Sequence, residues 1–328
     1  NIWGYYFDAG DWDGYPSHLV VPLGLMTLYD LRPDRFADGD VGNRYKLAAT
    51  DPAWIDEGSD GLPDVLNEAV WLIAYCRRAR QQLMAQGYGS GGVPDYTGRD
   101  AGADHPSWTD TRAWALTAES PDATYMYAGG AAYYACMLDE CHNRTHPGQR
   151  HPDSPAWQAE AEAAYAWAAA YIATNPADNT AEIERAKAVA CAALYRLTTN
   201  AAHQAAMRAI IEADSERNTP VWITPSRIHF AAFIYLLLTY ADYPNLDLGY
   251  YSTLGNRYVT MANNNEASAT GAASTGNGLR VVIDEYRSYM LGTFSSPRIY
   301  VSAVAHALTG QKKHLDTAHH AAAYALGG

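Results

Sequence analysis

An alanine-rich pattern of amphipathic helices recurs along most of the sequence, and it limits the possible folds more than any other feature. In the segment LPDVLNEAVWLIAYCRRARQQLMAQG, apolar residues recur at the three- and four-residue spacing of one helix face. Pro63 and Asp64 suit the first turn of such a helix, and Gly87 suits its C-terminal end. The spacing therefore predicts a helix that begins near Pro63 and ends before Gly87.

The same pattern predicts further helices along the chain. We expect them over residues 17–31, 121–139, 154–173, 180–197, 201–213, 226–240, 245–261, 279–291, 297–308 and 312–326. Convincing alternation of polar and apolar residues, which would indicate strands, is scarce. No repeat of the tetratricopeptide or HEAT kind recurs. About eleven helices joined by loops of uneven length predict an all-α fold, either a helical barrel or a superhelix.

The composition fits one folded domain over residues 1–328. Hydrophobic residues make up 48% of the chain and charged residues 18%, which allows a large core. No linker interrupts the chain, so we interpret the stretch Asn263 to Gly278 as a loop inside the domain. The net charge of −13 argues against nucleic acid or an anionic membrane as partner, and no apolar run approaches the length of a membrane span.

The four cysteines and the single glycosylation sequon say little about the compartment. None of the cysteines has CxxC spacing, which argues against a zinc site. Cys136 and Cys141 are close enough in the sequence to form a disulfide, and buried thiols are the alternative. The sequon at Asn143 permits secretion. No leader sequence is visible, so a secreted protein would be present in its mature form.

The stretch DAGDWDG near the N-terminus has three possible interpretations. Asp8 and Asp11 lie three residues apart, and Gly10 between them lets the backbone bend, so both carboxylates can face one small volume. Carboxylates held that close raise the pKa of one of them and can activate a shared water molecule. The same residues, with Asp13, also suit a turn or a calcium loop. The stretch alone leaves all three open.

Two further loops contain candidate functional residues. Asp56, Asp60 and Asp64 could bind calcium, but they run directly into the predicted helix after Pro63, so a structural role at the helix N-terminus is favoured. His105 and Trp108 occur on a polar loop and could form a sugar-binding platform, or Trp108 could pin the loop to the scaffold. Signatures of serine hydrolases, phosphate-binding loops, dinucleotide-binding folds and zinc proteases are absent from the sequence.

Taken together, these segments resemble glycoside hydrolase family 9, the inverting cellulases. YYFDAGDWDG resembles the DAGD signature of that family, and DEGSDGLPDVLNEAVW, GVPDYTGRDAGADHPSW, PDATYMYAGGAAYYA and ALTGQKKHLDTAHHAAAYALGG resemble later family segments in the same order. The matches are dense over the first 140 residues and sparse between residues 150 and 290.

The resemblance implies an (α/α)6 barrel with an open cleft, a β-glucan substrate and secretion. Asp11 would be the general base and Asp8 would orient the attacking water or hold Asp11 in place. His105 and Trp108 would contact sugar near the scissile bond. Arg298 matches an arginine of the cleft, and Trp222 is a candidate aromatic subsite. The reaction would require no cofactor, and calcium is a possible supporting ion.

The sequence also departs from the family pattern. The family has a helix before the DAGD signature, and its general-acid glutamate follows a segment that would lie beyond Gly328. The chain is then either a piece of a larger protein or a shortened relative. Glu285 precedes the ALTG segment and is typical of an ordinary helix surface, so we do not assign the acid to it. The leading hypothesis is an inverting β-1,4-glucanase. The alternatives are a non-catalytic helical barrel that binds carbohydrate or has a structural role, and a calcium-dependent module.

Overall fold

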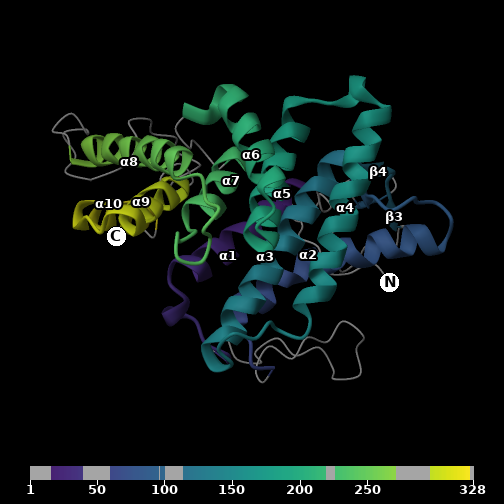
Figure 1. The fold of residues 1–328 in the computed structure, drawn as a ribbon, viewed down its shortest axis with the longest axis horizontal. Helices are drawn as coiled ribbons and strands as arrows, with labels where there is room; N and C mark the ends of the chain where they lie inside the picture. Colours follow the sequence, from purple (N-terminus) through teal and green to yellow (C-terminus); the bar gives the residue numbers. More distant parts are fainter. Residues whose placement is uncertain are drawn as a thin grey trace. The chain divides into compact units, whose positions relative to one another are not determined.

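The computed structural model describes residues 16–39, 60–95, 97–99, 114–218, 226–270 and 296–325, and helices dominate these residues (Figure 1). The α-helices are α1 (Val20–Leu31), α2 (Asp64–Ala85), α3 (Pro121–Thr145), α4 (Ser154–Thr174), α5 (Ala181–Thr198), α6 (Ala201–Ala213), α7 (Arg227–Leu236), α8 (Leu248–Thr270), α9 (Ser296–Thr309) and α10 (Lys312–Ala325). The 3-10 helices are η1 (Pro16–Leu19), η2 (Pro33–Arg35), η3 (Pro176–Asp178) and η4 (Ser215–Asn218). The strands are β1 (Val93–Pro94), β2 (Thr97–Arg99), β3 (Trp114–Leu116) and β4 (Glu119–Ser120).

Each predicted helix that falls on described residues is present, but some ends differ: α7 ends at Leu236, where the prediction ran to residue 240, and α8 begins at Leu248, where the prediction began at residue 245. The helix predicted over residues 279–291 lies outside the described residues. One prediction about a loop was wrong, because α8 continues to Thr270 through the first half of the stretch that we interpreted as a loop from Asn263 to Gly278. Lys313 of α10 donates a hydrogen bond to the Asn263 side chain (2.6 Å), and packing of α10 against α8 supports this extension.

The chain divides into two compact units, Asn1–Ile210 and Ile211–Gly328. The prediction of a single catalytic domain over residues 1–328 stays a prediction. In the first unit, α3 packs against α4 and α5, and α1 packs against α2 (Figure 1). Gly129 allows α3 to approach α5 closely, because a Cβ atom there would lie 2.8 Å from Cγ1 of Val189. The alanine-rich sequence thus becomes a set of closely spaced helices.

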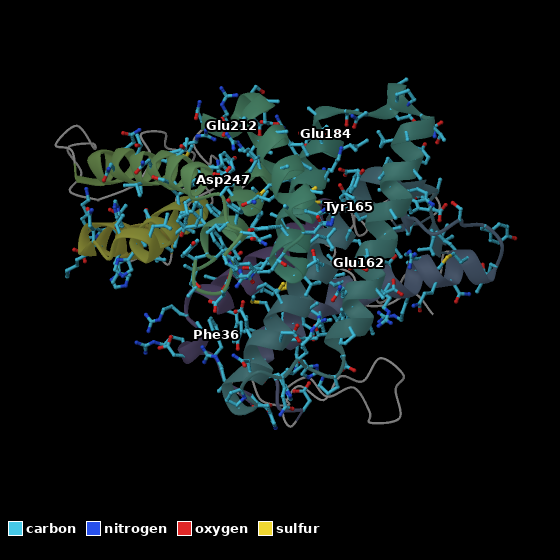
Figure 2. The ribbon with its side chains drawn as sticks, in the orientation of Figure 1. Phe36, Glu162, Tyr165, Glu184, Glu212 and Asp247 are labelled. Atoms are coloured by element: carbon cyan, nitrogen blue, oxygen red, sulfur yellow. The ribbon has the colours of Figure 1, made fainter. Side chains whose placement is uncertain are left out.

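Aromatic side chains fill the space between the helices of the first unit. Tyr165 reaches from α4 toward α5, where its hydroxyl lies 3.4 Å from Sγ of Cys191 (Figure 2). Its ring meets the edge of Tyr125 of α3, with the ring centres 5.4 Å apart. These contacts join three helices through one tyrosine, and they use the edge-to-face geometry that aromatic pairs prefer.

The second unit contains α7 to α10. Helices α8, α9 and α10 pack against one another. Asp247 caps α8, because its carboxylate accepts a hydrogen bond from the backbone N–H of Tyr250 (2.9 Å). Arg257 of α8 forms an ion pair with Glu212 at 2.9 Å. Glu212 and Asp247 are labelled in Figure 2.

The four cysteines are free thiols, so Cys136 and Cys141 form no disulfide. Burial raises the pKa of Cys76 to about 12 and that of Cys191 to about 11, and both therefore stay protonated at neutral pH. Within the described residues, none of the helices is long and apolar enough to cross a membrane.

A buried ionic cluster joins α1, α3 and α5 of the first unit. Arg196 of α5 donates to the carboxylate of Asp30 at the end of α1 (2.8 Å) and also pairs with Glu140 of α3. The hydroxyl of Tyr133 donates to Asp30 (2.8 Å). The side chains of Arg196 and Asp30 are only 4% and 6% exposed. Removing one of two buried charges is costly, because the other loses its compensation.

We expect Asp30→Asn to lower the free energy of unfolding by about 3 kcal/mol, because Arg196 then stays buried with only Glu140 to compensate it. Urea unfolding followed by circular dichroism measures this change. The matched control is Asp34→Asn, which removes an exposed carboxylate paired with Arg32. The control should unfold at the same urea concentration as the parent protein. Equal midpoints for both variants would contradict the prediction.

Candidate functional site

Described elements of the first unit flank the two segments that contain the predicted catalytic and sugar-binding residues. The C-terminal parts of α1, α3 and α5 meet at the Asp30–Arg196–Glu140 cluster. Because α3 packs beside both α1 and α5, their N-terminal ends point away from this cluster. Residues 1–15 precede η1 and α1, and residues 100–113 precede α3 by way of β3 and β4. The two segments are thus continuous with η1 and with the β2–β3 pairing of the first unit, and their own residues lie outside the described part of the chain.

A short β-ribbon leads from α2 toward residues 100–113 and back to α3. Strand β1 pairs antiparallel with β4, with Val93 opposite Ser120. Strand β2 pairs antiparallel with β3, with Thr97 opposite Leu116. These strands were not predicted from the sequence, because they are two or three residues long and show no useful alternation of polar and apolar residues.

Glu119 fixes the base of this ribbon. Its carboxylate accepts hydrogen bonds from the backbone N–H groups of Ser90 (2.8 Å), Gly91 (2.8 Å) and Gly92 (2.6 Å). The Ser90 hydroxyl donates a fourth bond at 2.8 Å. A carboxylate that accepts several N–H groups makes strong, charge-assisted bonds. The segment between α2 and β1 is thereby tied to β4, at the other edge of the ribbon.

Trp167 of α4 contacts the same segment, Ser90 to Gly92. Its indole N–H donates to the Ser90 hydroxyl oxygen (2.8 Å). A Cβ atom at Gly92 would lie 2.6 Å from the Trp167 ring, so glycine is required for this close approach. Arg80 of α2 donates to the carbonyl oxygen of Gly91 (2.6 Å). The segment is therefore held by α2, α4 and β4 together.

Glu160 of α4 connects this arrangement to the core. Its carboxylate accepts hydrogen bonds from Arg80 (2.8 Å), Gln81 (3.2 Å) and the Tyr127 hydroxyl (3.0 Å). Burial, together with the negative charge of Glu160, raises the pKa of Tyr127 well above its usual value. The phenol therefore stays protonated and remains a donor to Glu160.

Most residues predicted from the sequence as site residues lie outside the described part of the chain: Asp8, Asp11, His105, Trp108 and Trp222. Arg298 belongs to α9 in the second unit, and the structure describes its backbone but not its side chain. Their roles stay predictions. The sequence analysis did not identify Glu119 as the residue that ties down the ribbon. The available signal was the glycine-rich run GYGSGG before a proline, which predicts a loop in close contact with other groups.

No group of three or more His, Cys, Asp or Glu side chains in the described ranges is arranged to hold a metal ion. Asp60 accepts a hydrogen bond from the Leu62 N–H (2.8 Å), and Asp64 accepts one from the Gly39 N–H (2.7 Å). These bonds support the structural role that the sequence favours for them. Asp56 and Asp13 lie outside the described residues.

Solved structures with the same fold are endoglucanases and related proteins of glycoside hydrolase family 9. The GH family 9 endoglucanase J30 has a TM-score of 0.67 and 19% identity, over 97% of this chain and 55% of that chain. The GH9 protein of Bacteroides ovatus has a TM-score of 0.66 and 17% identity, over 97% and 56%. AaCel9A in complex with cellobiose-like isofagomine has a TM-score of 0.60 and 16% identity, over 95% and 55%. Neither a protein-family model nor a curated protein matches the sequence.

This similarity confirms the predicted fold class, an all-α (α/α)6 barrel of the family 9 type. The chain spans about half the length of the first two of these structures.

We expect Glu119→Ala to loosen the segment from Ser90 to Gly92, because three backbone N–H groups lose their shared acceptor. Amide hydrogen exchange over these residues should speed up by at least about tenfold, and the free energy of unfolding should fall by about 1–3 kcal/mol. The control is Glu182→Ala on α5, whose exposed carboxylate pairs with Arg185. Unchanged exchange in Glu119→Ala would show that the carboxylate does not hold this segment.

Proposed function

We propose, on the premise of this shared fold, that the protein hydrolyses β-1,4-glucosidic bonds of cellulose or a related β-glucan with inversion at the anomeric carbon. The observation that carries the proposal is the match to family 9 structures over 95–97% of this chain. The motifs in residues 1–15 and 100–113, which precede η1 and β3 of the first unit, also support it. Both segments contain residues that the family resemblance assigns to the reaction.

In the proposed reaction, Asp11 acts as the general base. It accepts a proton from a water molecule as that water attacks the anomeric carbon from the face opposite the leaving group. Asp8 orients the water or holds Asp11 in place. His105 and Trp108 contact the sugar beside the scissile bond, and Trp222 and Arg298 extend the binding surface. The reaction as written uses no metal ion.

Inversion also requires a carboxylic acid that protonates the leaving oxygen, about 6.5–9.5 Å from the base. We assign no residue among 1–328 to this role. A substrate with a very good leaving group bypasses the need for it, because a dinitrophenolate departs without protonation. With such a substrate, the role of the general base can be tested without the general acid.

We expect the protein to release dinitrophenolate from 2,4-dinitrophenyl β-cellobioside. Asp11→Asn should lower the rate by at least about 100-fold, since the water loses its proton acceptor. Asp8→Asn should lower it by about tenfold, and the matched control Asp13→Asn should leave it within about twofold of the parent rate. Proton NMR of the first product should show the α-anomer, as inversion requires.

A protein that binds carbohydrate without hydrolysing it is the second candidate, because a shared fold does not by itself imply a shared activity. Binding of cellotriose without any hydrolysis of the activated cellobioside would support this candidate and contradict the enzyme. An effect of Asp11→Asn no larger than that of Asp13→Asn would also contradict the assignment of the base.

We propose calcium only as a supporting ion of the acidic loops, and expect the rate on the activated cellobioside to be the same with calcium and with EGTA. A melting temperature that rises with calcium and falls with EGTA would identify a structural calcium site. Loss of hydrolysis in EGTA, restored by calcium, would contradict a reaction without metal.

A further inference from the structure

A pocket of about 860 Å³ lies between the C-terminal half of α2 and the residues around the β3–β4 connection. Its lining residues are Tyr75, Arg78, Ala79, Gln81, Gln82, Leu83, Ala85, Gln86, Tyr88, Ala115, Leu116, Thr117 and Ala118. All of them belong to the first unit, and none is a residue that the proposed reaction uses. The volume falls in the range of small-molecule sites.

One face of α2 supplies most of the polar groups of the pocket. Tyr75, Arg78, Gln82 and Gln86 follow each other at three- and four-residue spacing, which places them on the same side of the helix. Tyr75 is buried, whereas Gln82 and Gln86 are exposed. Each amide offers both a donor and an acceptor, as sugar hydroxyl groups do. The lining thus combines a buried tyrosine with neutral groups that can hydrogen-bond hydroxyls.

Tyr88 lines the pocket with an aromatic ring that is 81% exposed. Its backbone is fixed by the end of α2, where Gly87 adopts φ +74° and the Tyr88 N–H donates to the Leu83 carbonyl oxygen (2.9 Å). An exposed tyrosine on a fixed backbone offers an apolar face at low entropic cost, and its hydroxyl stays available to water or ligand.

The two walls of the pocket are held independently of any ligand. On the α2 side, a Cβ atom at Gly89 would lie 2.7 Å from Cβ of Leu83, so the chain after Tyr88 runs tightly along the helix. On the other side, Ala115 and Leu116 pair with β2, and residues 117–118 connect this pairing to Glu119, whose carboxylate binds the Ser90 to Gly92 backbone. A site with fixed walls is largely pre-formed, as binding sites commonly are.

We propose that this pocket is a carbohydrate-binding site that takes a short stretch of a neutral β-linked glucan chain. The exposed Tyr88 ring suits stacking on a sugar, and the glutamine amides suit recognition of its hydroxyl groups. Among the lining residues that the structure describes, all but Arg78 are uncharged, which suits a ligand that is recognised mainly through hydrogen bonds to its hydroxyl groups. The choice of a β-glucan rests on the proposed function, whereas sugar binding rests on the lining itself.

The full chain with Asp11→Asn, which prevents turnover of the ligand, is the protein for the test. Hydrogen exchange measured with and without cellotriose should show protection in two stretches, residues 78–88 and 115–118. Maltotriose, whose α-linkages curve the chain, should protect them less. Equal protection by both sugars would overturn the β-glucan assignment, and no protection by either would overturn the site.

Substitutions distinguish this pocket from any other sugar site. Tyr88→Ala and Gln82→Ala remove exposed lining groups, and each should weaken cellotriose binding at the protected stretches by about tenfold. The matched control is Tyr240→Ala, which removes another exposed tyrosine, 57% exposed, from the second unit. The control should bind like the parent. Affinity unchanged in both pocket variants would overturn the proposal.

Failure of this proposal and failure of the proposed function give different results. Hydrolysis of the activated cellobioside without protection at residues 78–88 and 115–118 overturns the pocket and leaves the enzyme standing. Cellotriose protection at these stretches without hydrolysis keeps the pocket and overturns the enzyme. Thermal unfolding of each variant shows whether the fold is intact, so a binding loss can be assigned to the missing side chain.

Discussion

The close burial of α3 is the constraint on which the first unit depends. From Pro121 to Leu138 nearly every side chain of this helix is buried, including the rings of Tyr125, Tyr127 and Tyr133. A helix that is buried all round needs neighbours on every side, and α1, α2, α4 and α5 provide them. Small residues make this possible, since alanine and Gly129 let the neighbouring helices approach without leaving voids.

Because α3 is so deeply buried, polar side chains beside it need partners within the protein. Two clusters of such polar groups lie toward the two ends of α3. Toward its C-terminal end, Arg196, Asp30 and Glu140 compensate one another within the unit. Near its N-terminal end, Glu119 accepts hydrogen bonds from the backbone of the segment after α2, and Glu160 accepts one from Arg80 of α2. The first cluster stabilises the helices, whereas the second positions a loop. The C-terminal half of α3 thus contributes to the cluster that stabilises the helices, and the groups that position the loop lie near its N-terminal end.

The helices were predictable because each depends on local information. The spacing of apolar residues in α2, together with Pro63, Asp64 and Gly87, indicates its ends within a few residues. The extension of α8 to Thr270 was not predictable, because the asparagine-rich sequence favours a loop, whereas packing of α8 against α9 and α10 is a tertiary contact. The β-ribbon was missed for a related reason, since pairs this short depend on the Glu119 bonds as much as on strand propensity.

The residues of the candidate site also fall into those that the sequence indicates and those that only the folded structure brings together. The motifs around Asp8, Asp11, His105 and Trp108 are properties of the sequence, and the family resemblance alone assigns them chemical roles. The pocket beside Tyr88 could not be predicted from the sequence. Its two walls come from α2 and from residues 115–118, which only folding brings together. The sequence by itself determined the helices and the family-type fold, because helix periodicity and motif order are written along the chain. The tertiary structure decided which distant side chains share a carboxylate or a cavity, because those contacts depend on how the helices pack.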